Sequence, residues 1–151
     1  MPQIDLKAIK KLRDATSASI ADVRRALDEA NGDEKKALEW LKKRASEIAA
    51  KKADRETGEG LIEAYIHGGG KVGVLIEILC ETDFVAKTDE FKHLAKEIAM
   101  QVAAMNPEDV ESLLKQEYIR DSSQTIEQMV KAMIGKLGEN ISVKRFIRFE
   151  L

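Results

Sequence analysis

The stretch "GLIEAYIHGGGKVGVLIEILC", residues 60–80, decides the fold of this chain. On both sides of its three glycines, apolar side chains return at every second position, which is the period of a β-strand. The two alternating sets are Ile62, Ala64 and Ile66 before the glycines, and Val72, Val74, Ile76, Ile78 and Cys80 after them. Two such runs joined by a short flexible segment predict an antiparallel hairpin in which each set shares one face.

Helices and a third strand are predicted after the hairpin. Apolar side chains at helical spacing predict one helix from about Thr88 to Met105 and another over residues 123–137, which Gly138 stops. Asn106 and Pro107 end the first of these and can begin a further helix as its cap and first-turn proline. In "NISVKRFIRFEL", residues 140–151, the apolar set Ile141, Val143, Ile147 and Phe149 alternates with Lys144, Arg148 and Glu150, as in a half-buried strand. Residues 55–151 therefore predict a small α+β domain, a three-stranded antiparallel sheet covered on one face by helices.

Residues 1–54 predict a separate helical domain with a linker. Three short helices lie between residues 5 and 44, and their apolar faces, including Trp40, form a small core of their own. Ser19 is placed to cap the second helix, Asn31 or Gly32 to end it, and Asp33 to cap the third. Residues 44–56 are rich in helix formers but have only a thin apolar stripe, which predicts an exposed helical linker broken by "TGEG" at 57–60.

Composition narrows the functional class. The chain has 151 residues, 44% of them apolar and 34% charged, which is typical of a globular protein with a real core. No stretch approaches the roughly 18 apolar residues of a membrane span, and the start lacks the apolar segment of a secretory signal, so we expect a cytoplasmic protein with no membrane partner. Its 25 basic and 27 acidic side chains are interspersed, giving a formal charge of -2, so direct nucleic-acid binding is not expected.

Several residues that could carry chemistry have simpler explanations. "HGGGK", residues 67–71, is followed by a strand and lacks the serine or threonine of a phosphate loop, so we interpret it as a hairpin tip. One cysteine and two histidines, at positions 67, 80 and 93, cannot supply a typical zinc site, and no metal or cofactor is expected. Asp83, Glu81 and His93 could be assembled into a general acid and base, but carboxylates near a helix start are commonly caps.

The segment "TDFV", residues 82–85, is the least routine part of the chain. It follows the second strand of the hairpin and places Asp83, which prefers water, beside Phe84, which avoids it. In one interpretation Phe84 and Val85 tuck under the sheet while Thr82 or Asp83 caps a turn. In the other, Phe84 projects as an anchor for a partner, because interfaces concentrate affinity in a few aromatic residues held at the ends of rigid elements. The residues alone leave both interpretations open.

Three segments in order resemble the translation elongation factor Ts family. They are "LRDATSASIADVRRALDEANGDEKKALEWLKKR" at 12–44, "ILCETDFVAKTDEFKHLAKEIAMQVAAMNP" at 78–107, and "GENISVKRF" at 138–146. The resemblance implies a guanine-nucleotide exchange factor for elongation factor Tu, acting on its GDP-bound and nucleotide-free forms without a catalytic residue of its own. It also implies that the three helices are a ubiquitin-associated-type domain that docks on the nucleotide-binding domain of Tu.

The resemblance assigns roles to individual residues as well. Asp83 and Phe84 would intrude near the magnesium site of Tu, while Thr82 and Val85 fix the shape of the loop. Where the family usually has "TGAGMMD", this chain has "TSASIAD" at 16–22, so Ser19 and Ile20 would have to supply the contact at that turn.

The chain has one copy of the sheet-and-helix unit where longer family members have two, and we predict a homodimer because a three-stranded sheet leaves an open edge. The rival hypotheses are a ubiquitin-associated-type binding adaptor without exchange activity, and an acid/base enzyme.

Overall fold

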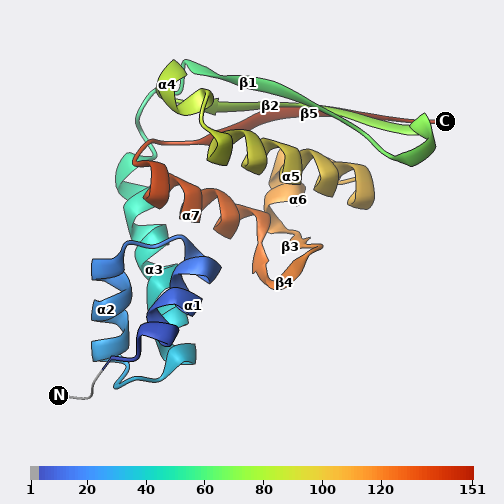
Figure 1. The fold of residues 1–151 in the computed structure, drawn as a ribbon. Helices are drawn as coiled ribbons and strands as arrows, with labels where there is room; N and C mark the ends of the chain where they lie inside the picture. Colours follow the sequence, from blue (N-terminus) through green and yellow to red (C-terminus); the bar gives the residue numbers. More distant parts are fainter. Residues whose placement is uncertain (1–3) are drawn as a thin grey trace.

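The computed structural model describes residues 4–151, in which one open sheet lies over a layer of helices and a three-helix unit stands below one end (Figure 1). The first three residues of the predicted 1–54 unit lie outside this description. In chain order the elements are α1 (Leu6–Thr16), α2 (Ile20–Glu29), α3 (Glu34–Lys52), β1 (Glu59–Ile66), the 3-10 turn η1 (Gly68–Gly70), β2 (Val72–Cys80), α4 (Asp83–Ala86), α5 (Asp89–Met105), α6 (Val110–Lys115), β3 (Glu117–Tyr118), β4 (Asp121–Thr125), α7 (Ile126–Leu137) and β5 (Ser142–Glu150). The predicted α+β class is confirmed, with β1, β2 and β5 forming an antiparallel sheet.

The predicted caps of the N-terminal helices are present. Ser19 Oγ accepts a hydrogen bond from the Asp22 N–H, and Asp33 accepts from the first-turn amides of α3. Asn31 and Gly32 both have positive φ, at 52° and 83°, and so make the turn between α2 and α3.

The predicted exposed helical linker over residues 44–56 is confirmed only in part. The segment is helical as far as Lys52, and most of residues 50–56 are exposed. It is not a separate connector, however, because α3 continues without a break from Glu34 and its second half packs against α7. Ala49 is buried there in the same cluster as the residues of the sheet, so the thin apolar stripe belongs to a packed face.

The sheet has one covered and one open face. α5 packs against β1 and β2 on the covered face, whereas no helix or strand of residues 4–151 lies over the other face (Figure 1). The β2 set Val74, Ile76, Ile78 and Cys80 is buried on the covered face, as its alternation predicted. The β1 set Ile62, Ala64 and Ile66 also shares one face, but pairing of Ile62 with Glu77 puts that set on the open side.

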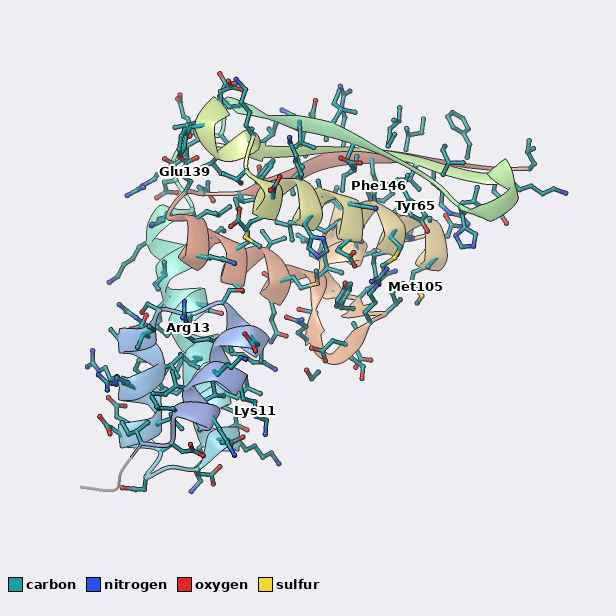
Figure 2. The ribbon with its side chains drawn as sticks, viewed as in Figure 1. Lys11, Arg13, Tyr65, Met105, Glu139 and Phe146 are labelled. Atoms are coloured by element: carbon teal, nitrogen blue, oxygen red, sulfur yellow. The ribbon has the colours of Figure 1, made fainter. Side chains whose placement is uncertain are left out.

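A bulge in β5 overturns part of the predicted alternation. Glu77 pairs with Arg145 and Ile78 with Val143, so Lys144 is an extra residue. Before the bulge, Ile141 and Val143 are buried as predicted. Beyond it the faces exchange: Phe146 and Arg148 lie on the helix side, while Ile147 and Phe149 are 48% and 68% exposed on the open face. Figure 2 shows Phe146, with Tyr65 of β1, between the sheet and α5.

Two local predictions between α5 and α7 also fail. Asn106 closes α5 in a left-handed conformation instead of opening the next helix, and Asp109 caps α6 by accepting from the Ser112 N–H. The start of the helix predicted over 123–137 is instead part of a short hairpin, β3–β4, and α7 begins only at Ile126. Buried Gln101 of α5 holds this hairpin by donating to the Glu117 carbonyl and accepting from the Ile119 N–H.

Two apolar cores exist among residues 4–151. The smaller consists of residues of α1, α2 and the first half of α3, and the larger lies between the sheet, α5, α6 and α7. α3 contributes to both, with Leu41 in the smaller and Ala49 in the larger. The domain boundary at residues 54 and 55 stays a prediction.

Candidate functional site

The segment "TDFV" forms the start of α4, a four-residue helix at one end of the sheet. Thr82 caps it, since its side chain accepts from the Val85 N–H, and α4 contacts β1, β2 and α5. Val85 and Ala86 are 6% and 5% exposed in the larger core. Phe84 is 83% exposed and points away from that core. Val85 therefore tucks in as the first interpretation has it, but its burial of Phe84 is wrong, because Phe84 projects. A role for Phe84 as an anchor stays a prediction.

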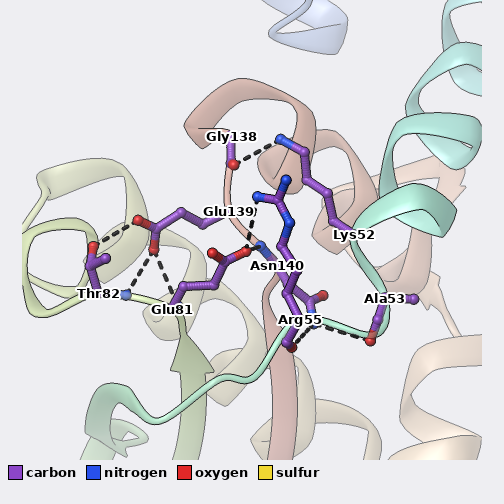
Figure 3. A network of polar contacts seen from close by, with 8 residues as sticks. All are labelled: Lys52, Ala53, Arg55, Glu81, Thr82, Gly138, Glu139 and Asn140. Carbon is purple, nitrogen blue, oxygen red and sulfur yellow. Dashed lines mark hydrogen bonds and ion pairs between the residues drawn. The ribbon is translucent and has the colours of Figure 1, made fainter.

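A network of polar contacts surrounds the start of α4 (Figure 3). Glu139, in the turn between α7 and β5, accepts from the Glu81 N–H at 3.1 Å, the Thr82 N–H at 2.9 Å and the Thr82 hydroxyl at 2.7 Å. In return the Glu81 carboxylate accepts from the Asn140 N–H at 2.7 Å. The strand exit and the turn are thus joined by contacts that run both ways.

Asp83 lies in the first turn of α4 and pairs with Lys87 one turn later, at 2.6 Å. Hydrogen bonding to the Asp83 carboxylate, followed by its charge, raises the pKa of Lys87. Both side chains are more than half exposed, at 59% and 75%, and such surface pairs add little to stability. Breaking the Asp83–Lys87 pair therefore costs little free energy, and the Asp83 carboxylate is free to contact a polar group of another molecule.

Cys80 lies directly beneath the start of α4. Its thiol is fully buried and donates a hydrogen bond to the Thr82 carbonyl at 3.1 Å. Burial raises the pKa of the thiol, and the nearby Glu139 carboxylate raises it further. A thiol in this state is a poor nucleophile, so the structure favours a packing role for Cys80.

The turn between α1 and α2 carries the second predicted contact. Ser19 is exposed at the N-cap of α2, and Ile20 beside it is 50% exposed. Ser17 closes α1 in the left-handed region, at φ 57°. Ala18 and Ser19 of this turn line a cavity of about 90 Å³ together with residues of α3 and α7, among them Lys136. Ile20 does not line the cavity, and its exposed apolar side chain lies at the start of α2.

The residues proposed for the acid/base enzyme take part in separate interactions. Asp83 pairs with Lys87, while His93 lies 3.9 Å from buried Glu97 on α5. His67 sits at the hairpin tip against Tyr65, and Trp40 donates a hydrogen bond to Glu29 within the helical unit.

Within residues 4–151, no three side chains of His, Cys, Asp or Glu are grouped as a metal site. No helix over the same residues is long and apolar enough to cross a bilayer.

Sequence reasoning missed the part that Glu139 and Asn140 play at this site. Both lie 57 or more positions from their partners at Glu81 and Thr82, so no local pattern reveals the contact. The signal available was "GEN" at 138–140, which stood in the third matching segment but was assigned no role.

Comparison with known proteins gives consistent matches. A family model described as "Elongation factor TS" matches residues 81–151. "Elongation factor Ts" of Caldanaerobacter subterraneus subsp. tengcongensis is 43% identical over 97% of this chain and 96% of its own length. "Elongation factor Ts" of a Nostoc species is 48% identical over all of this chain and 48% of its own length, and "Elongation factor Ts, chloroplastic" of Guillardia theta is 43% identical over 99% and 89%. The first alignment spans 192 positions, so part of that relative has no counterpart among the 151 residues here.

Proposed function

The chain belongs to the elongation factor Ts family of translation elongation factors, and we propose that it promotes release of GDP from elongation factor Tu. In this proposal the chain acts by differential binding and catalyses no chemical step. It binds GDP-loaded Tu, lowers the affinity for the nucleotide and remains on the nucleotide-free form. GTP binding then completes the cycle by displacing it. The site of action would be the cytoplasm.

The exposure of Phe84 is the observation that carries this proposal. A phenylalanine that is 83% exposed gives up apolar burial unless a partner covers it. Covering it is worth roughly 1.5 to 3 kcal/mol. Phe84 would wedge between helices of Tu near the magnesium site, while Asp83 leaves Lys87 and perturbs polar groups around the ion. Thr82 and Val85 keep the short helix in shape, one as its cap and the other as its buried anchor.

Loosening the magnesium site weakens GDP because the ion bridges the phosphates to the protein and neutralises their charge. The coupling is reciprocal, so the affinity that the chain removes from GDP equals the affinity that GDP removes from the chain. Allosteric couplings are typically about 1 to 3 kcal/mol, which corresponds to about 5- to 150-fold in affinity. Burial of Phe84 contributes to this coupling only to the extent that nucleotide-free Tu accommodates the inserted side chain and GDP-bound Tu excludes it.

The helical unit would supply docking through the turn before α2. It resembles a ubiquitin-associated-type domain, and Ile20 is a half-exposed apolar side chain at the place where the family usually carries methionines. Ser19 shapes the turn as the cap of α2. Docking at this turn would raise the local concentration of α4 at its target.

Release of a fluorescent GDP analogue from purified elongation factor Tu tests the proposal. We expect the chain at saturating concentration to accelerate release, and Phe84→Ala to lose most of the acceleration. Met105→Ala is the matched control, because Met105 is a half-exposed apolar side chain at the far end of α5. Unchanged release with the wild-type chain would favour the adaptor alternative. A Phe84→Ala variant as active as wild type would show that the loop assignment is wrong.

A homodimer is the second part of the proposal. The open sheet face carries the exposed apolar side chains Ile62, Ile66, Leu75, Ile147 and Phe149. A second copy presents the same apolar surface, so two open faces are complementary to each other. This face, rather than the edge of the sheet, is the surface that we propose for pairing, because apolar patches of this kind on a protein surface mark interaction sites.

A further inference from the structure

The orientation of Phe84 depends on contacts outside α4. A four-residue helix cannot hold itself in water, because one turn fixes several backbone angles for few hydrogen bonds. The Phe84 side chain contributes no packing of its own, since it is 83% exposed. The buried side chains of Val85 and Ala86 hold α4 against the core, Thr88 donates to the Val85 carbonyl behind it, and Thr82 holds its start. Contacts that fix Thr82 therefore help to set the direction in which Phe84 points.

Glu139 is the residue that fixes Thr82. Its carboxylate receives three donors from Glu81 and Thr82, at 2.7–3.1 Å. Hydrogen bonds to an ionised carboxylate are shorter and roughly twice as strong as those between neutral groups. Thr82 meanwhile accepts from the Val85 N–H, so the chain of contacts runs from Glu139 through Thr82 into the helix.

The turn that carries Glu139 is itself anchored. Lys52, at the end of α3, donates to the Gly138 carbonyl at 2.7 Å. The Asn140 side chain donates to the Ala53 and Arg55 carbonyls at 3.4 and 2.9 Å. Figure 3 shows these contacts on the opposite side of the turn from Thr82. Glu139 is thus a rigid point between α4 and the end of the helix that leads to the N-terminal unit.

We propose that Glu139 is a positioning residue for nucleotide exchange, holding α4 so that Phe84 is presented in one direction. This inference rests on the proposed function, because presentation matters only if Phe84 enters a partner. Glu139 acts through Thr82 and is half-buried behind it. A contact group held about 1 Å too loosely loses much of its effect, which is the reason for such a support.

Nucleotide release with Glu139 variants is the first test. We expect Glu139→Ala to lower the maximal rate of GDP release about tenfold at saturating chain, and Glu139→Gln, which keeps one acceptor oxygen, to fall between it and wild type. The half-saturating concentration should change less, because docking by the helical unit is intact. Glu111→Ala is the matched control, since Glu111 is an exposed glutamate that pairs only within α6, with Lys115. In a Phe84→Ala background, Glu139→Ala should add little, because both changes then act on the same contact.

Thiol labelling gives a second readout that needs no partner. Cys80 is the only cysteine, is fully buried and bonds to Thr82, so its reaction with a thiol reagent reports opening of α4. We expect Glu139→Ala to raise the labelling rate several-fold under conditions where circular dichroism shows a folded chain. Because loss of the Glu139 charge also lowers the pKa of the thiol, the rates are compared across a pH series, and only an increase that remains at equal thiolate fraction counts as opening of α4. Should Glu139→Ala fail to fold, Glu139→Gln carries the same comparison at unchanged side-chain size.

The outcomes separate the two proposals. An inert wild-type chain in the release assay overturns the proposed function and with it the role of Glu139 in exchange, while labelling still decides whether Glu139 fixes α4. An active wild type with Glu139 variants that match it in both assays overturns the inference alone. A loss of global stability without a change in maximal release rate would mean that Glu139 is only structural, and would also overturn it.

Discussion

Phe84 and Val85 are consecutive residues of one helical turn, yet the first is 83% exposed and the second 6%. Successive side chains on a helix point about 100° apart, so a single turn at the end of a strand can bury one neighbour and expose the other. The arrangement separates two tasks. Val85 fixes α4 to the core, and Phe84 is free for another molecule.

This separation predicts that two alanine substitutions reduce stability by very different amounts. Val85→Ala removes buried atoms and leaves a cavity, so we expect the free energy of unfolding to fall by about 1–3 kcal/mol. Phe84→Ala removes only exposed atoms, and the change should stay within about 0.5 kcal/mol. Urea denaturation followed by circular dichroism measures both. A large destabilisation by Phe84→Ala would mean that the side chain is packed in solution.

Ser17 is the site of a predicted stabilising change. It closes α1 with φ at 57°, a conformation that costs an L-residue about 1–2 kcal/mol and glycine almost nothing. We expect Ser17→Gly to raise the free energy of unfolding by about 0.5–1 kcal/mol, after the greater entropy of the unfolded glycine chain is subtracted. Thermal denaturation of the two proteins provides the comparison.

Ser19→Gly is the matched control for this change. Ser19 has φ at -65° and caps α2 with its hydroxyl, so glycine there relieves no strain and should cost a few tenths of a kcal/mol. Equal shifts in the two variants would contradict the explanation by backbone conformation. Ser17 and Ser19 stand where the family usually has the two glycines of "TGAGMMD". Ser19 adds a helix cap, whereas Ser17 adopts a strained backbone conformation.

The buried thiol predicts a loss of stability at alkaline pH. The pKa of Cys80 is raised above its ordinary value of 9.0, first by burial and then by Glu139. The folded chain therefore keeps this proton at a pH where the unfolded chain releases it. The contribution of the protonated Cys80 thiol to the free energy of unfolding is fully present below about pH 9. Above that pH it falls, by at most about 1.4 kcal/mol per pH unit.

Comparison with Cys80→Ala isolates that contribution. The variant should be less stable than wild type at pH 7.5, because a buried sulfur is lost, and the difference should shrink between pH 9 and pH 10.5. Urea denaturation across this range measures it. Tyr118, whose pKa is also raised by burial and by its bond to Glu97, titrates in both proteins and cancels. A difference that stays constant to pH 10.5 would contradict the assignment to Cys80.

The features that the sequence predicted well are those set by near neighbours. Ser19 and Asp33 cap the helices that follow them, because a cap needs only an amide two or three positions away. The hairpin followed from alternation and from the glycines at 68–70. The sequence singled out "TDFV" as the candidate site, but it could not show whether Phe84 is buried, because that depends on tertiary packing.

The features that were missed depend on distant contacts. The bulge at Lys144 appears only when β5 is paired with β2, and it reversed the faces of Ile147 and Phe149. The alternation of β1 could not show which of its faces is covered either. Leu61 and Tyr65 on one face are apolar, and so are Ile62 and Ile66 on the other. Glu139 reaches its partners only after the chain has folded. Because the sequence did not assign the faces of β1 and placed the second half of β5 on the wrong face, it did not predict an apolar surface on the open face of the sheet.

The open face leads to a prediction about self-association. Pairing puts Ala64, Leu75 and Ile147 in one row across the three strands, with Leu75 in the centre. Beside it, Ile66 and Phe149 flank Gly73, where a Cβ would come within 3.1 Å of the Ile66 side chain. The absence of a side chain at Gly73 therefore leaves room for the Ile66 side chain.

Leu75→Lys tests whether the open faces meet. A charge at the centre of an apolar interface is left without a partner, so we expect light scattering at high micromolar concentration to give a dimer mass for wild type and a monomer mass for the variant. Leu6→Lys is the matched control, because Leu6 is 76% exposed on α1 and lies outside the sheet. A stable interface needs about 800 Å² from each partner. A monomer mass for the wild-type chain removes the dimer, and a dimer mass for Leu75→Lys moves the contact to another surface.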